Sequence, residues 1–281
     1  MNTVIKHFVT LHVRIALQGI FALMLLISNG CERINSPTAP ADPVLDSYLV
    51  INTSAGAMLH AILVGETDAA DIAQSVQADL DHMSALVDTI ALHTGLGIHK
   101  MTYAGGNATT SAIRQSIRAL DVGPDDVILF YHSGHGGRTT RTATPWPNMY
   151  FVHDPEWTGL NLHDVFIELQ GKGSRLLLAL SDSCNSYVEL PASAALLQEA
   201  SMKGSSFGYQ QLFLEGRAAI IASGSLAGEM SYGSTAGGRF TIQFIQAVQR
   251  ATADDNPNWS DVMERATWRI SNAQQPQYAM Y

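Results

Sequence analysis

The sequence is poor in cysteine and in charged residues, and its charges are mostly acidic. Only two cysteines, Cys31 and Cys184, occur among 281 residues, which excludes a disulfide framework. Charged residues make up 15% of the chain, with 25 acidic against 16 basic side chains, so no nucleic-acid partner is expected. Apolar residues make up 46%, which is enough to form one large core. The composition therefore fits a globular domain of ordinary size.

Residues 1–30 have the pattern of an export signal. Lys6 and Arg14 form a basic start, and an apolar stretch over residues 15–27 follows, shorter than the ~20 residues of a permanent transmembrane helix. Cys31 directly follows a small residue, as the lipidated cysteine does in bacterial lipoprotein signals, although Ser28 replaces the usual leucine. The alternatives are an ordinary cleaved signal or an uncleaved anchor. We expect an exported protein, periplasmic or at the cell surface, anchored in the membrane through a lipidated Cys31.

A flexible tether and one folded domain are predicted after this signal. Residues 31–45 are rich in proline, which fits neither a helix interior nor a strand ladder. Over residues 46–281 apolar runs alternate with helical patterns, which is typical of parallel strands joined by crossover helices. The apolar runs are continuous, so helices should cover both faces of the sheet. We predict an α/β fold with a doubly wound, mostly parallel sheet. Strands are expected over 59–64, 98–103, 127–131, 176–180 and 218–222, and helices after Ser75, Thr109 or Thr110, and Asn161 and over 240–251 and 260–273.

Two polar motifs follow two of these strands directly. HSGHGG occupies residues 132–137, and SDSCNS occupies residues 181–186. Parallel strands end at one edge of the sheet, with neighbours ~4.8 Å apart, so His135 and Cys184 can meet there. An imidazole that takes the proton of a thiol makes the thiol a nucleophile, and the amides of Gly136 and Cys184 can face a developing oxyanion. The alternative is a glycine-rich turn beside a buried, inert cysteine.

In this strand context, YHSGHGGR at 131–138 and LLLALSDSCNS at 176–186 resemble the motifs of caspase-like cysteine peptidases, most closely metacaspases and their bacterial relatives. The hallmarks of that family are a strand-end S-G-H-G followed by a strand-end D-x-C-x-S. The resemblance covers roughly residues 59–251 and implies the fold predicted above. It implies a cysteine endopeptidase acting on peptide or protein substrates, with His135 as general base and acid and Cys184 as nucleophile. The alternative is a non-catalytic caspase-like scaffold or binding module.

The resemblance also implies a preference for Arg or Lys before the scissile bond. Asp182 matches the acid that lines the S1 pocket of metacaspases, and Ser133 matches a second residue of that pocket. Asp79 and Met83 fit the spacing of an early family segment whose aspartate also contributes to S1, although Ala78 replaces its asparagine. The alternative for Asp182 is a helix-capping or turn aspartate.

Regulation is also implied by the resemblance. Many relatives cut themselves in a linker after the nucleophile, and Gly and Ser in residues 201–210 predict a mobile, exposed segment there. We therefore expect autoprocessing after Lys203. Many metacaspases require calcium, so calcium is a candidate cofactor, but no acid of this chain can be assigned to it; no other cofactor is expected.

Two further patterns are less favoured. Residues 204–208 match G-x-S-x-G around Ser206, but no apolar strand precedes them and no clear helix follows, so a serine nucleophile is not expected. A metal site could be drawn from five side chains, but two of them leave a strand end rather than share a helix face, and no metal is expected. These five are His132, His135, His153, His163 and Cys184.

Overall fold

The computed structural model describes residues 56–154, 159–187 and 204–281. The chain divides into two units, residues 1–48 and 49–281, and every described residue belongs to the second. Each helix in these ranges is too short or too polar to pass through a bilayer. The export signal, Cys31, the tether and Lys203 lie outside the described residues, so the expectations about them stay predictions.

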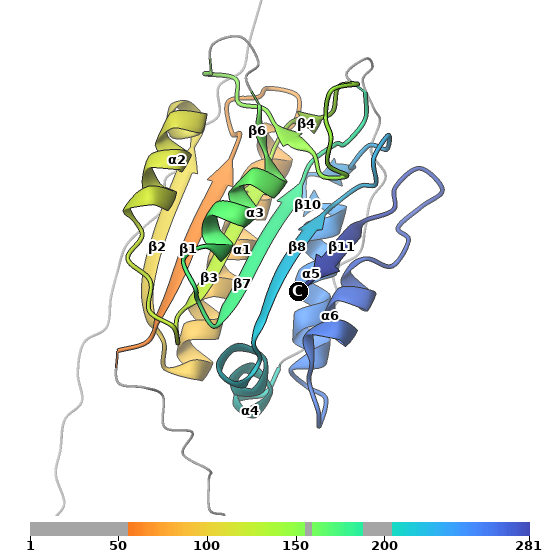
Figure 1. The fold of residues 1–281 in the computed structure, drawn as a ribbon. Helices are drawn as coiled ribbons and strands as arrows, with labels where there is room; N and C mark the ends of the chain where they lie inside the picture. The colour runs from red at the N-terminus through yellow and green to blue at the C-terminus, as the bar shows by residue number, and fades with distance from the viewer. Residues whose placement is uncertain (1–55, 155–158, 188–203) are drawn as a thin grey trace, which may run out of the picture. The chain divides into compact units, whose positions relative to one another are not determined.

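A six-stranded sheet forms the centre of the fold, in the order β11-β8-β7-β3-β1-β2 (Figure 1). Five strands are parallel, and β11 at one edge pairs antiparallel with β8. The strands are β1 (Met58–Gly65), β2 (Gly97–Ala104), β3 (Val127–Ser133), β7 (Leu176–Asp182), β8 (Ala218–Ser223) and β11 (Gln277–Met280). The predicted mostly parallel sheet is confirmed.

Five short strands of the described residues lie outside this sheet. Strands β4 (Gly136–Gly137), β5 (Asn148–Met149) and β6 (Leu160–Asn161) form a small antiparallel sheet, and β9 (Gly233–Ser234) pairs with β10 (Gly237–Gly238). In Figure 1, β4 and β6 lie beyond the ends of the central strands toward which the arrows point. The small sheet therefore adjoins the edge of the sheet at which the two polar motifs begin.

Helices cover both faces of the central sheet. The odd-numbered apolar residues of β1 and β3 and the even-numbered ones of β7 join one core cluster with α1, α5 and α6, and the alternate residues of these strands join a second cluster with α2 and α3. Figure 1 shows α2 and α3 in front of the sheet and α1 and α5 behind it. Successive side chains of a strand point to opposite faces, so continuous apolar runs require this double cover. The helices are α1 (Ala73–Thr94), α2 (Thr110–Ala119), α3 (Leu162–Gln170), α4 (Ser206–Gln210), α5 (Arg239–Ala251) and α6 (Trp259–Ala266), with a 3₁₀ turn at Gly105–Asn107 and a π-helical turn at Gln211–Glu215.

The predicted helix starts are confirmed where a side chain caps the helix. Thr109 caps α2 by accepting the Ala112 amide, and Asn161 caps α3 by accepting the His163 amide. Helix α1 begins earlier than predicted, at Ala73, because the Ala69 carbonyl accepts the amides of both Ile72 and Ala73 and continues a turn into the helix.

The last predicted helix, 260–273, is wrong in its second half. Helix α6 ends at Ala266, and the chain then turns through a bridge between Ser271 and Gln274. The Gln274 side chain is fully buried and donates to the Gly224 carbonyl at 2.9 Å. This tertiary contact holds the chain in a turn where sequence periodicity favours a helix.

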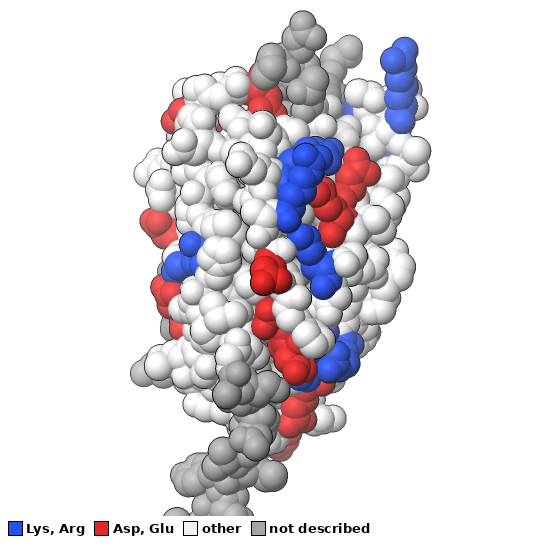
Figure 2. Space-filling model, turned by 60° about the vertical axis from the view of Figure 1, so that its left-hand side comes forward, with Lys and Arg blue, Asp and Glu red and all other residues white. Residues whose placement is uncertain are grey.

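Charges are mixed on the face that Figure 2 presents. Basic and acidic side chains alternate over it, rather than forming a field of one sign.

A carboxylate at the opposite end of the sheet ties β1 to the loop before β3. Asp126 accepts the amides of Met58 at 2.8 Å and Gly123 at 2.7 Å, and His60 Nε2 lies 3.0 Å from it. Burial acts to raise the pKa of Asp126, but these three hydrogen bonds together lower it below its usual value. A depressed pKa in the folded state means stability that is present above the pKa of the unfolded chain and is lost as the pH falls through the lower, folded value.

We expect Asp126→Asn to lower the free energy of unfolding by about 1–3 kcal/mol at pH 7, because the amide side chain cannot accept three donors in the same way. The difference should shrink as the pH falls below about 4, because protonation of Asp126 then removes the advantage of the wild type. Urea unfolding from pH 3 to 7 measures this. Asp121→Asn, an exposed aspartate in the same loop, is the control and should leave the stability unchanged. Equal effects of both substitutions would contradict the assignment.

Candidate active site

The register of β3 and β7 brings the two polar motifs together. Ser133 and Asp182, the last residues of the two strands, are paired, so His135 and Cys184 each lie two residues beyond the same edge. The Gly134 amide donates to the Asp182 carbonyl at 3.4 Å, which continues the contact past the strands. His135 and Cys184 line one pocket of about 70 Å³. The predicted meeting of imidazole and thiol at the sheet edge therefore agrees with the geometry.

Arg138 fastens the two motifs further along the chain. Its amide donates to the Ser186 carbonyl at 2.9 Å, and its guanidinium donates to Asn185 Oδ1 at 3.2 Å. The same guanidinium donates to the carbonyls of Thr142 and Thr144, at 3.4 and 3.1 Å. Because the Arg138 side chain is buried, these bonds fix the segment after His135 against the segment after Cys184.

The thiol of Cys184 is covered by the backbone of Ser231. The Ser231 amide donates to Sγ at 3.4 Å, and Sγ donates to the Ser231 carbonyl at 3.6 Å. Burial raises the pKa of the Cys184 thiol, the charge of Asp182 raises it too, and the Ser231 amide only partly offsets them. The Cys184 thiol is therefore protonated at rest, and it would need a base to act as a nucleophile.

His135 is bound by acids of the loop between β1 and α1. Its amide donates to Glu66 Oε2 at 2.9 Å, and its Nε2 lies 3.3 Å from Asp71 Oδ1. Burial raises the pKa of Glu66, although the hydrogen bonds from the amides of His135 and Val152 act against this. Among the described residues the imidazole and the Cys184 thiol make no hydrogen bond to each other, as is common before substrate binds.

The two predicted oxyanion donors lie side by side. A Cβ on Gly136 would come within 2.5 Å of the Cys184 carbonyl oxygen, so only glycine allows this approach. The Tyr150 amide donates to the His135 carbonyl at 3.0 Å. In an antiparallel ladder, residue pairs that are joined by hydrogen bonds alternate with pairs that are not. His135 and Tyr150 form a bonded pair, so the next pair, Gly136 with Met149, is not bonded. The Gly136 amide therefore turns away from β5.

Two buried carboxylates form the floor of the pocket. Asp79 on α1 accepts the Ser133 hydroxyl and the Gly238 amide, both at 2.7 Å. Asp182 accepts the Ser231 hydroxyl at 2.5 Å and the Thr241 amide at 2.9 Å. The three residues to which the resemblance assigns an S1 role, Asp79, Ser133 and Asp182, thus line one pocket.

Glycine at position 238 leaves room between these two carboxylates. A Cβ there would lie 2.2 Å from Asp182 Oδ2 and 2.9 Å from Asp79 Oδ2. Burial, and then the charge of Asp182, raise the pKa of Asp79 to about 8, while the bonds from Ser133 and Gly238 lower it. Burial also raises the pKa of Asp182. Two carboxylates so placed do not both ionise readily, and a cation between them would stabilise both charges.

Asp182 also has the structural role named as its alternative. The amides of Phe240 and Thr241, in the first turn of α5, both donate to its carboxylate. A carboxylate at this end of a helix satisfies free amides and faces the positive end of the helix dipole. Asp182 is thus both a cap of α5 and a wall of the pocket.

Four residues of the site were not predicted from the sequence: Glu66, Asp71, Ser231 and Thr241. Glu66 had a usable signal, since it follows β1 directly and so lies at the same sheet edge as the motifs. No sequence signal pointed to Ser231 or Thr241. Ser231 is 47 residues from Cys184 in the chain, and Thr241 is 59 residues from Asp182.

The five-residue metal interpretation gains no support. No group of three or more His, Cys, Asp or Glu within residues 56–154, 159–187 and 204–281 is arranged to hold a metal ion. His132 lies fully buried in β3, with Nδ1 2.9 Å from Ser181 Oγ. Burial lowers the pKa of His132 to about 3, so this histidine is neutral and packs in the core.

The segment around Ser206 differs from the expectation. Mobility was predicted over 201–210, and this is wrong for residues 204–210: Ser205 caps α4 by accepting the Gly208 amide at 3.0 Å. Helix α4 therefore begins at Ser206, inside the G-x-S-x-G motif, and a π-helical turn follows it. Ser206 Oγ contacts His93 Nδ1 at 2.7 Å, far from the strand-end motifs in sequence.

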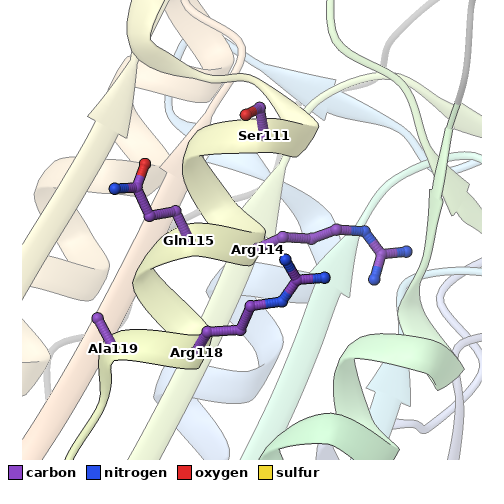
Figure 3. Close-up of a pocket in the computed structure, with 5 residues that line it drawn as sticks. All are labelled: Ser111, Arg114, Gln115, Arg118 and Ala119. Atoms are coloured by element: carbon purple, nitrogen blue, oxygen red, sulfur yellow. The ribbon is translucent and has the colours of Figure 1, made fainter.

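A second pocket lies on the outer side of α2 (Figure 3). Arg114 and Arg118 line it and both approach Glu168, at 3.7 and 3.6 Å. Exposed ion pairs of this kind contribute little free energy. None of its five lining residues, Ser111, Arg114, Gln115, Arg118 and Ala119, belongs to the strand-end pocket.

Comparisons with known proteins agree with this fold. The chain matches the caspase domain family over residues 49–280, and it therefore belongs to that family. The crystal structure of protein GSU0716 from Geobacter sulfurreducens is similar in fold, with a TM-score of 0.50 and 18% sequence identity, over 79% of this chain and 93% of that one. A search of curated proteins finds no match.

Proposed function

We propose that this caspase-family protein is a cysteine endopeptidase that cleaves peptides after Arg or Lys. The observation that carries the proposal is one pocket lined by His135, Cys184 and two buried carboxylates, Asp79 and Asp182. The first two residues supply a base and a nucleophile, and the last two attract a cation.

The chemistry follows from these positions. His135 takes the proton of the Cys184 thiol as Sγ attacks the scissile carbonyl, and it returns a proton to the leaving amine as the acyl-enzyme forms. The amides of Gly136 and Cys184 bind the oxyanion of the tetrahedral intermediate. Water then attacks the thioester, with His135 again as base, and the thiol is released.

The substrate must first displace Ser231. Its hydroxyl donates to Asp182 Oδ1 and its backbone covers Sγ, so it occupies places that a basic side chain and a scissile carbonyl would take. A bound Arg or Lys would replace the neutral donor by a charged one, and charge-assisted hydrogen bonds are roughly twice as strong as neutral ones.

A set of peptides that differ only in the residue before the scissile bond tests the proposal. Arg and Lys peptides should be hydrolysed at least about 100-fold faster than the Asp peptide, because two carboxylates repel an acid. Cys184→Ala is the negative control. Preference for Asp would overturn the specificity, and a folded wild type that hydrolyses no peptide would favour the non-catalytic module.

A further inference from the structure

The loop between β1 and α1 holds His135 at two points. Glu66, which is 3% exposed, accepts the His135 amide at 2.9 Å through Oε2 and the Val152 amide at 2.6 Å through Oε1. Asp71 lies in the same loop, with Oδ1 3.3 Å from His135 Nε2. One acid thus fixes the backbone of His135, and the other faces its ring.

Asp71 is placed by a series of tight turns. The Glu66 amide donates to the Ser133 carbonyl at 3.1 Å, which ties the loop to the end of β3. The Ala69 amide then donates to the Glu66 carbonyl at 3.2 Å, and the Ile72 amide to the Ala69 carbonyl at 3.0 Å. Ile72 lines the same pocket as His135. The backbone on both sides of Asp71 is therefore held relative to the imidazole.

The contact determines which ring nitrogen of His135 can act as base. An ionised carboxylate only accepts hydrogen bonds, so in the neutral ring the proton facing Asp71 is on Nε2. Nδ1 is then the nitrogen free to take the Cys184 proton. When it does so the ring becomes a cation, and the negative charge of Asp71 stabilises it.

We propose that Asp71 is a positioning residue for His135, which fixes its tautomer and stabilises its protonated form. The inference rests on the proposed peptidase activity and adds a third residue to the His135 and Cys184 pair. Asp71 is 69% exposed, so its substitution does not threaten the core.

Three substitutions at Asp71 separate charge from shape: Asp71→Asn, Asp71→Ala and Asp71→Glu. The matched control is Asp68→Asn, which removes one charge from the same loop, where Asp68 Oδ2 faces His153 Nε2 at 2.7 Å. Two quantities are measured for each protein: kcat and KM on an Arg peptide, and the rate at which iodoacetamide alkylates Cys184, followed on the Cys184 peptide by mass spectrometry.

We expect Asp71→Asn and Asp71→Ala to lower kcat about tenfold, with KM within about twofold, because only the proton-transfer step is affected. Alkylation should slow by a similar factor. Asp71→Glu should recover most of kcat, and Asp68→Asn should match the wild type in both measurements.

Other results would overturn the inference. They are a wild-type kcat and alkylation rate in Asp71→Asn, a change in KM alone, or an equal loss in Asp68→Asn. If the wild type hydrolyses no peptide, the proposed function fails, but alkylation still decides the role of Asp71: a rate unchanged by Asp71→Asn refutes it, and a slower rate supports it.

Discussion

Cys184→Ala and His135→Ala should each lower kcat/KM on an Arg peptide by at least about 1,000-fold, because one variant lacks the nucleophile and the other lacks its base. Both residues lie beyond the strand ends, and the His135 side chain is 34% exposed. The apolar clusters on the two faces of the sheet do not include them. The melting temperature of both variants should therefore stay close to that of the wild type.

The double variant distinguishes a working pair from two separate effects. Nucleophile and base act in one step, so removal of both should be little worse than removal of either. His153→Ala serves as the control for loss of a histidine, because His153 is 43% exposed and pairs with Asp68 instead. Near-normal activity of either single variant, in a folded protein, would contradict the assignment of the pair.

Sequence periodicity predicted the five parallel strands because strand burial is a local signal, and it missed the edge strand β11, which is only partly buried. Apolar runs gave strands within two residues of their observed ends, and β3 and β7 extend past the predicted runs only to include polar residues such as Ser133 and Asp182. Those polar ends are buried all the same, since they form the pocket. Strand-end position was also sufficient to place His135 and Cys184 at one edge.

The surroundings of the pair could not be predicted in the same way. Asp71 lies in a loop without periodicity, and only the fold brings it to His135. Ser231 reaches the thiol from a loop after β8, and no spacing in the sequence relates it to Cys184. The cap role of Asp182 required the position of α5, which is set by packing of that helix on the sheet.

The strongest pH dependence is expected from the pocket floor. The pKa of Asp79 is raised to about 8 by burial and by the charge of Asp182, so Asp79 is mostly protonated at pH 7 in the free protein. A guanidinium bound between the two carboxylates favours the ionised form, so binding releases a proton. Binding of an Arg peptide is therefore opposed at low pH and favoured as the pH rises toward 8.

The pH also affects hydrolysis in ways that do not involve the pocket charge, so a ratio of two substrates is needed. Citrulline has the shape of arginine without its charge, and a citrulline peptide senses the reactive pair but not the pocket charge. We expect the ratio of kcat/KM for Arg over citrulline to rise about tenfold from pH 6.5 to 8.5. Measurement of both substrates at each pH cancels the pH effects that the two substrates share.

Asp79→Asn is the informative variant for this pocket. The Asn oxygen can still accept the Gly238 amide, and the Ser133 hydroxyl can turn to accept from the Asn amide group, so both contacts survive. Asp182→Asn is less suitable, because an amide group in place of Oδ1 would face Ser231 Oγ, which already accepts a hydrogen bond from Gln274. In Asp79→Asn the Arg-to-citrulline ratio should be lower and should no longer change between pH 6.5 and 8.5. A ratio that is flat in the wild type, or that rises equally in Asp79→Asn, would show that Asp79 does not carry the charge that receives the substrate.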